Sequence, residues 1–251
     1  MNTVCKLCLL SDDLRNSHAI PDAFFRRILA ANNGHAKILD SSLLGYKESS
    51  DSWATYQLCG VCEQHLNSTY ERYSIGVLRG HGGVAKRSEA GVTFSGIDTN
   101  RICIFLISIL WRAACSNHDS YNGAVFPYEF YKSNTVEKLR LSIYQNLIVP
   151  TNLVSIKISR IFDSKVGFSA DKLKDLIVAP FHRPFGEKGK VSVNFVIEGF
   201  LITLIMPGIS HKERRRHNII NRTKNFIFAP YLEITNDIDL EKILVPKVFV
   251  S

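Results

Sequence analysis

Cys5-Lys6-Leu7-Cys8 opens the stretch that decides the fold and Cys59-Gly60-Val61-Cys62 closes it, with Ser17-His18-Ala19-Ile20-Pro21 between them. Two residues between paired cysteines let both thiolates bind one ion, so two such pairs supply the four ligands of a tetrahedral zinc site. In a chain with no visible secretion signal, this spacing favours a metal site over four unrelated buried thiols. We therefore predict that Cys5, Cys8, Cys59 and Cys62 hold a structural Zn²⁺.

Length and charge bound the class of protein. The 251 residues suffice for one or two domains with a buried core. Residues 1–100 carry ten Lys and Arg against ten Asp and Glu, whereas residues 101–251 carry 21 against 13, so the whole net charge of +8 lies in the second part. A basic excess favours nucleic acid as partner. The apolar runs 102–110 and 200–206 are shorter than the ~20 residues that span a bilayer, so we expect no membrane association and a cytoplasmic protein.

Periodicity predicts an α+β protein with an N-terminal module and a mixed helical and β-rich domain. Apolar spacing predicts helices at 22–31, 62–78, 101–117 and 135–147, the third of them apolar nearly all round and therefore buried. Strands are expected at 38–46, 53–58, 153–161, 191–197, 201–206, 225–229 and 243–250, with Glu198-Gly199 as a hairpin turn. Glycines at 80, 82 and 83 begin a mixed stretch, 81–100, which we predict to be a linker between a module at 1–80 and a domain at 101–251.

The order CxxC, Ser-His-x-Ile-Pro, CxxC and then a polar residue on a helix resembles the zinc-bound HNH endonucleases. The resemblance covers about residues 1–78. It implies a ββα-metal, treble-clef-like module. Members with two CxxC knuckles include phage junction-resolving endonucleases, so the resemblance also implies a bacterial or phage protein, DNA rather than RNA as substrate, and a role in defence against foreign DNA.

Carried over residue by residue, the resemblance places His18 at the family's general base and Glu63 where two-knuckle members have a metal-binding asparagine. A neutral imidazole can take a proton from water, and a carboxylate is a suitable ligand for Mg²⁺ or Mn²⁺. Asn67 follows Glu63 by one helical turn and is a candidate second ligand. The alternatives are that His18 caps a turn and that Glu63, Asn67 and Glu71 form a solvated helix face.

The sequence departs from the family at Ser17, where an acidic residue or histidine usually binds the catalytic metal. A serine hydroxyl is a poor substitute, and Asp13, His65, Asn67 or Glu71 are the candidates to compensate. The spacing of these residues does not choose among them. Arg112, within the buried helix, requires a carboxylate or carbonyl partner, and we expect a structural pair. Cys103 and Cys115 of the same helix are expected to be core residues.

A basic segment at 211–224 is the candidate nucleic-acid surface, since each phosphate neutralised by a cationic side chain releases counterions. The alternative is a solvated loop. Its cationic residues are Lys212, Arg214, Arg215, Arg216, Arg222 and Lys224.

These observations predict a metal-dependent HNH-type endonuclease that hydrolyses nucleic-acid phosphodiesters. The alternative is a zinc-stabilised module that binds nucleic acid or protein without catalysis, and a small-molecule enzyme with its site in residues 101–251 is a third reading. A homo-oligomer or a partner protein is compatible with both main readings. The chain has no GxxxxGK[ST], HExxH or GxSxG motif, which removes support for a P-loop, a zincin or a serine hydrolase.

Overall fold

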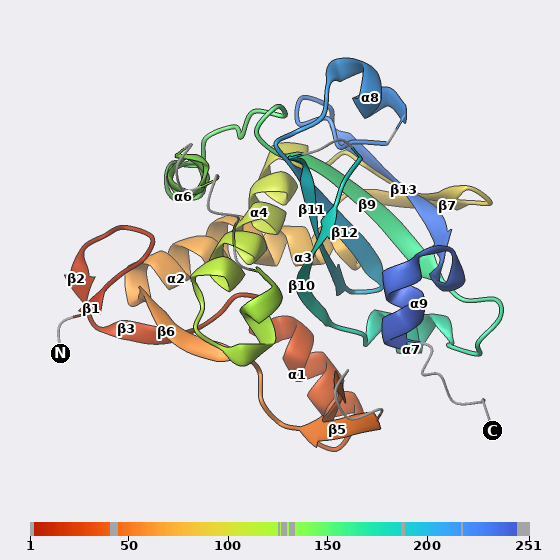
Figure 1. Ribbon diagram of the computed structural model, residues 1–251, viewed down its shortest axis with the longest axis horizontal. Helices are drawn as coiled ribbons and strands as arrows, with labels where there is room; N and C mark the ends of the chain where they lie inside the picture. The colour runs from red at the N-terminus through yellow and green to blue at the C-terminus, as the bar shows by residue number, and fades with distance from the viewer. Residues whose placement is uncertain are drawn as a thin grey trace.

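Helix α4 (Thr99–Cys115) lies at the centre of the protein, between the N-terminal elements and a large sheet (Figure 1). The computed structural model describes residues 3–40, 45–124, 126, 130, 134–186, 189–216 and 218–244. The Asp98 side chain caps the helix by accepting a hydrogen bond from the backbone N–H of Arg101 at 3.0 Å. Nearly every residue from Ile102 to Ala113 is buried, which confirms the predicted buried helix.

The seven-stranded sheet confirms the expected α+β class. Its order is β10-β11-β12-β9-β13-β8-β7, and every pairing is antiparallel except that of β13 with β9. Glu198 and Gly199, with φ of 51° and 71°, form the predicted turn between β11 and β12. The strands are β7 (Val84–Ser88), β8 (Gly91–Ser95), β9 (Ser155–Phe162), β10 (Val178–Pro184), β11 (Val191–Ile197), β12 (Phe200–Met206) and β13 (Phe226–Glu233).

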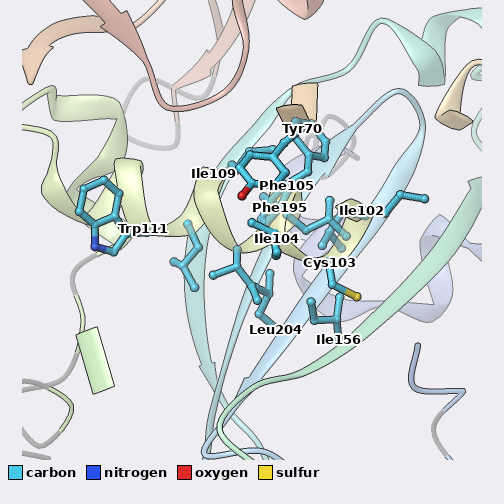
Figure 2. Close-up of a cluster of buried hydrophobic side chains, with 14 of the residues drawn as sticks. Tyr70, Ile102, Cys103, Ile104, Phe105, Ile109, Trp111, Ile156, Phe195 and Leu204 are labelled. Carbon is cyan, nitrogen blue, oxygen red and sulfur yellow. The ribbon is translucent and has the colours of Figure 1, made fainter. Parts of the chain in front are cut away.

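The main core forms where α4 packs on this sheet. Figure 2 shows Phe105 and Ile104 of α4 beside Phe195 of β11 and Leu204 of β12, and all four side chains are fully buried. Burial of one such side chain contributes about 1.5–3 kcal/mol, so this contact contributes substantially to the stability of the fold. Leu66 and Tyr70 of the N-terminal part belong to the same cluster, so one continuous core joins the two ends of the chain.

The N-terminal elements surround a two-stranded sheet and a long helical segment. Strand β3 (Leu14–His18) pairs antiparallel with β6 (Ala54–Cys59), and helix α1 (Asp22–Ala31) follows β3 as predicted. After β6 the chain continues as α2 (Gly60–Leu66), a π-helical turn η1 (Asn67–Glu71) and α3 (Arg72–Leu78). Two further strand pairs are β1 (Thr3–Val4) with β2 (Ser11–Asp12) and β4 (Ala36–Asp40) with β5 (Gly45–Ser49).

The remaining elements are short, apart from α6. Helices α7 and α9 flank a second, smaller core around Ile161, Leu173 and Leu240. In the described part of the chain, no helix combines the length and apolar character that crossing a membrane requires. These elements are η2 (Asp119–Ala124), α6 (Thr135–Gln145), α7 (Ala170–Lys174), α8 (His211–Arg216), η3 (Ile234–Asn236) and α9 (Ile238–Leu244).

Three expectations require correction. The expected linker at 81–100 contains the β7–β8 hairpin, because Val92 and Phe94 alternate into the main core. The expected strand at 38–46 is instead parts of two strands, β4 and β5, and its residues 41–44 lie outside the described residues. The expected strand at 243–250 begins inside α9, and its residues 245–250 lie outside the described residues as well.

Candidate metal centre and adjoining cleft

Four cysteine sulfurs come together at the N-terminal end of the molecule. The Sγ atoms of Cys5, Cys8, Cys59 and Cys62 all lie within 4.8 Å of one another, and all four thiols are free. Cys8 Sγ and Cys59 Sγ are 3.9 Å apart. Ligands of a tetrahedral ion with Zn–S bonds of ~2.3 Å are about 3.8 Å apart, so the cluster matches such a site. The predicted four-cysteine grouping is confirmed.

Local backbone geometry places each pair of cysteines. Cys5 and Cys8 lie in the tight loop between β1 and β2, where the Leu9 N–H donates to Cys5 O at 2.9 Å and Leu9 adopts a φ of 63°. Cys59 ends β6 and Cys62 lies in the first turn of α2. The Cys59 N–H donates to Cys5 Sγ at 3.3 Å. Although burial opposes the effect, hydrogen bonds from backbone N–H groups lower the pKa of the Cys5 thiol to about 7, whereas burial raises the pKa values of the Cys59 and Cys62 thiols.

His18 is the last residue of β3 and lies beside the start of α1. Its Nε2 is 2.9 Å from Ser52 Oγ and 3.7 Å from Asp22 Oδ1, and its ring is tilted against Phe25 at 6.2 Å. Burial lowers the pKa of His18 below 6.5, although Asp22 opposes this effect. The imidazole is therefore neutral at pH 7, the form that a general base requires.

A cleft of about 520 Å³, the histidine cleft, brings His18 together with the helical residues predicted to accompany it. Glu63 of α2 and Asn67 and Glu71 of η1 all line it. The π-helical turn runs from Asn67 to Glu71, and such turns occur frequently at functional sites. In the part of the chain that the structure describes, the His, Asp and Glu side chains of this cleft do not form a second group as compact as the four cysteines.

Glu63 is a cleft residue whose carboxylate is only partly satisfied by hydrogen bonds. Its Oε2 is buried and has no hydrogen-bond partner among the described residues. Burial raises the pKa of Glu63 above its ordinary value, while the positive charge of Arg112 opposes the rise. A buried carboxylate oxygen without a donor costs free energy, which a bound cation would recover.

The structure distinguishes among the residues considered in place of Ser17. Ser17 itself is fully buried, donates to Arg15 O at 3.2 Å and is not among the residues that line the cleft. His65 packs edge-on against Tyr70 and, like Asp13, is absent from the cleft wall. Asn67 and Glu71 alone among the four candidates line it. The Ser17 side chain also hydrogen-bonds the Glu63 carboxylate, so it contacts a candidate ligand residue without lining the cleft.

The expected structural pair of Arg112 is present. Arg112 is fully buried, and its Nη2 donates to Glu71 Oε1 at 2.6 Å, so the charge of Glu71 is already neutralised within the protein. This pair joins α4 to η1 at the floor of the histidine cleft.

Replacement of Glu71 by alanine is expected to lower the free energy of unfolding by about 3 kcal/mol, because a buried guanidinium loses its counterion. Replacement of Glu63 by glutamine should change it little or raise it, because Oε2 lacks a partner among the described residues. Urea denaturation of the two variants and the wild type tests both expectations. Equal destabilisation by the two changes would show that Glu63 is a structural residue.

Among its described side chains, the basic segment at 211–224 includes two arginines that bond within the protein. Arg222 is 7% exposed and its Nη2 donates to Val154 O at 2.8 Å, while Arg214 Nε donates to Ile209 O at 3.0 Å. Arg222 therefore anchors the segment to the residue before β9, whereas the Arg214 bond is local to the loop that leads into α8. Lys212 and Lys224 are exposed, and the side chains of Arg215 and Arg216 lie outside the described residues.

Sequence reasoning missed the cationic wall of the histidine cleft. Asp22 and Arg26 of α1, Arg72 of α3, and Arg79 and His81 just after α3 line it. Arg26 Nε pairs with Asp22 Oδ2 at 2.9 Å. The signal available in the sequence was weak: Asp22, Arg26 and Arg72 lie on the polar faces of two predicted helices, and only the tertiary structure brings them to one cleft.

Comparison of the chain with protein-family models, with curated proteins and with solved structures finds no match to any of them.

Proposed function

We propose that this protein is a metal-dependent endonuclease of the HNH type that hydrolyses phosphodiesters of nucleic acid. The observation that carries the proposal is that His18, Glu63 and Asn67 line one cleft. His18 ends one strand of a β pair, and Glu63 and Asn67 lie in the helical segment that follows the second strand. This order of strand, strand and helix, adjoining four clustered cysteines, is the arrangement that the ββα-metal, treble-clef-like reading requires.

The four cysteines would hold one Zn²⁺, which would serve structure rather than chemistry. Four thiolates fill a tetrahedral shell and leave no open position for water or substrate. The ion would join the β1–β2 loop to the start of α2 and so hold Glu63, the residue after Cys62, at the edge of the histidine cleft. Free thiols also suit a reducing compartment, and a cytoplasmic location is part of the proposal.

Glu63 and Asn67 would hold a Mg²⁺ or Mn²⁺ ion, whose chemistry is to stabilise negative charge on the phosphoryl and leaving oxygens. His18 takes a proton from the attacking water. In the tautomer that donates Nε2–H to Ser52 Oγ, Nδ1 carries the lone pair that accepts this proton. Arg72 supplies positive charge on the cleft wall for the phosphates of the substrate, whereas Arg26 and Arg79 of the same wall are paired with Asp22 and Glu198.

A second candidate is a zinc-stabilised module that binds nucleic acid or a partner protein without cleaving it. The observation in its favour is that Ser17, at the family's usual position for an acidic ligand, is buried, while Glu71 is paired with Arg112. Both readings share the cationic cleft wall, so catalysis alone separates them. DNA is the preferred substrate on the resemblance to HNH endonucleases, and a role in defence against foreign DNA follows from the same resemblance.

The decisive experiment is a nuclease assay on supercoiled plasmid, single-stranded DNA and RNA, with Mg²⁺, Mn²⁺ or EDTA, on protein of measured zinc content. The proposal expects cleavage that needs an added divalent ion and is lost in Glu63→Gln, although that variant folds. Tight binding of the same substrates without cleavage under any ion would move the conclusion to the binding module.

Cleavage is expected to depend on pH through His18. Because burial holds the pKa of His18 below 6.5, the imidazole stays neutral above that value and becomes protonated as the pH falls through its lowered pKa. The rate should therefore be flat at neutral and mildly alkaline pH and fall on the acid side with a midpoint below 6.5. Asp22→Asn should move the midpoint to still lower pH, since Asp22 favours the protonated form. A pH profile of kcat/KM for both proteins measures this, and an unchanged midpoint would contradict the role of His18.

A further inference from the structure

A second and larger cleft, of about 750 Å³, lies over one face of the seven-stranded sheet and is named the sheet cleft. Arg79 and His81 line both this cleft and the histidine cleft, so the two adjoin at the end of α3. The sheet cleft takes its walls from α1, α7 and the β7–β8 hairpin, which the sequence does not place together.

Its floor is a row of aromatic and cationic side chains on adjacent strands. Arg160 of β9 lies in register beside Tyr231 of β13 on one side and Phe200 of β12 on the other. The Arg160 guanidinium stacks over the Phe200 ring at 4.7 Å. Phe162, two residues along β9 and therefore on the same face, meets Tyr231 edge-on at 5.7 Å and is 38% exposed.

The acidic groups of the sheet cleft are already bound within the protein. Glu198 is held by Arg27 at 2.5 Å and by Arg79 at 2.6 Å. Asp163 accepts hydrogen bonds from three backbone N–H groups, and Asp171 pairs with Lys174 at 2.8 Å. The carboxylates therefore do not compete for the remaining cations of the cleft.

Two arginines of the cleft remain available for an anion. Among the described residues, neither Arg87 nor Arg160 makes an ion pair. Arg87 projects from β7 on the cleft side, and Arg160 Nη1 donates only to the backbone O of Glu198, at 2.6 Å. Burial, followed by the charge of Arg87, lowers the pKa of Arg160. Two guanidinium groups that face one space without an anion favour a bound phosphate.

We propose that the sheet cleft binds an unpaired stretch of a nucleic-acid strand and leads it into the histidine cleft past Arg79. Arg87 and Arg160 contact the phosphates, and Phe162 and Tyr231 stack on the bases. This assignment rests on the proposed function for the identity of the neighbouring site. Aromatic side chains inside the sheet cleft can stack only on bases that are not paired in a duplex, so the ligand is single-stranded.

Fluorescence anisotropy in EDTA, which prevents cleavage, tests the proposal with labelled single-stranded DNA, single-stranded RNA and blunt duplex DNA of one sequence. Arg87→Glu is expected to weaken single-strand binding about tenfold. The slope of log K against log salt concentration should become shallower by about 0.7, because one phosphate contact is lost. Lys86→Glu is the matched control, because it makes the same charge change on β7. Lys86 lies opposite Thr93 in the register of β7 with β8 and does not line the cleft.

Phe162→Ala is expected to weaken binding about tenfold through lost stacking. Its control is Phe226→Ala, which removes a comparably exposed ring of β13 outside the cleft. Equal effects of Arg87→Glu and Lys86→Glu, duplex binding as tight as single-strand binding, or no binding by the wild type would overturn the proposal.

The outcomes separate this proposal from the nuclease assignment. Binding that is sensitive to Arg87→Glu, in a protein that cleaves nothing, keeps the sheet cleft and removes the hydrolase. Metal-dependent cleavage that is lost in Glu63→Gln but unchanged in Arg87→Glu keeps the hydrolase and removes the sheet cleft. A preference for RNA over DNA among single strands supports the cleft and identifies the 2′-hydroxyl as part of its ligand.

Discussion

Replacement of Cys62 by serine is expected to abolish binding of the structural metal and to unfold the N-terminal part of the protein. Binding of structural zinc by small modules contributes about 10–16 kcal/mol at neutral pH, more than the whole stability of most domains. The β1–β2 loop depends on that contribution, because Val4, Leu9 and Leu10 at its surface are more than half exposed and bury little apolar area. Chelation of the wild type should have the same effect.

Metal analysis of the purified protein and hydrogen exchange of its backbone amides measure this prediction. The wild type should carry about one zinc ion per chain, and Cys62→Ser almost none. Cys115→Ser is the matched control, since Cys115 is a free, half-buried thiol outside the cluster. Exchange should accelerate across β1, β2 and the start of α2, while α4 keeps its protection within the main core. A wild-type protein that binds no metal would remove the basis of the assignment.

Replacement of His18 by alanine is expected to lower the rate of metal-dependent cleavage by about 10²- to 10⁴-fold, the usual contribution of a general base. The effect should fall on kcat rather than on KM, because the imidazole acts on water and not on the bound strand. Zinc content and the urea midpoint should stay close to those of the wild type, since one ring nitrogen meets only Ser52 and Asp22.

His35→Ala provides the control for His18→Ala. His35 is exposed and does not line the histidine cleft, so its removal should leave cleavage unchanged. A His18→Ala protein that cleaves at the wild-type rate, with zinc intact, would exclude His18 as the base and leave the binding module as the better reading. Parallel loss in both variants would point to a general effect of preparation and would likewise not support a specific role.

Local patterns predicted the elements that depend on near neighbours. The helices at Asp22–Ala31 and Thr99–Cys115 follow from apolar spacing, and the Glu198-Gly199 turn follows from a residue type that adopts positive φ. The β7–β8 hairpin escaped prediction because every residue of β7 is exposed, so that strand lacks the alternation that marks a half-buried strand. β10 was missed because it lies at the sheet edge, contains two prolines and has a register shift at Val178.

The candidate site divides in the same way. Spacing alone identified the four cysteines, because a knuckle is closed by residues adjacent in sequence, and the family resemblance pointed to His18. The choice of Asn67 and Glu71 over His65 and Asp13, and the burial of Arg222, were decided by how α2, η1 and α4 pack together. The sheet cleft likewise joins residues from Arg27 to Tyr231. The sequence determined the cysteine cluster and the helices through short-range geometry. The tertiary structure decided which charges face a cleft and which are buried, because that depends on contacts between residues distant in the chain.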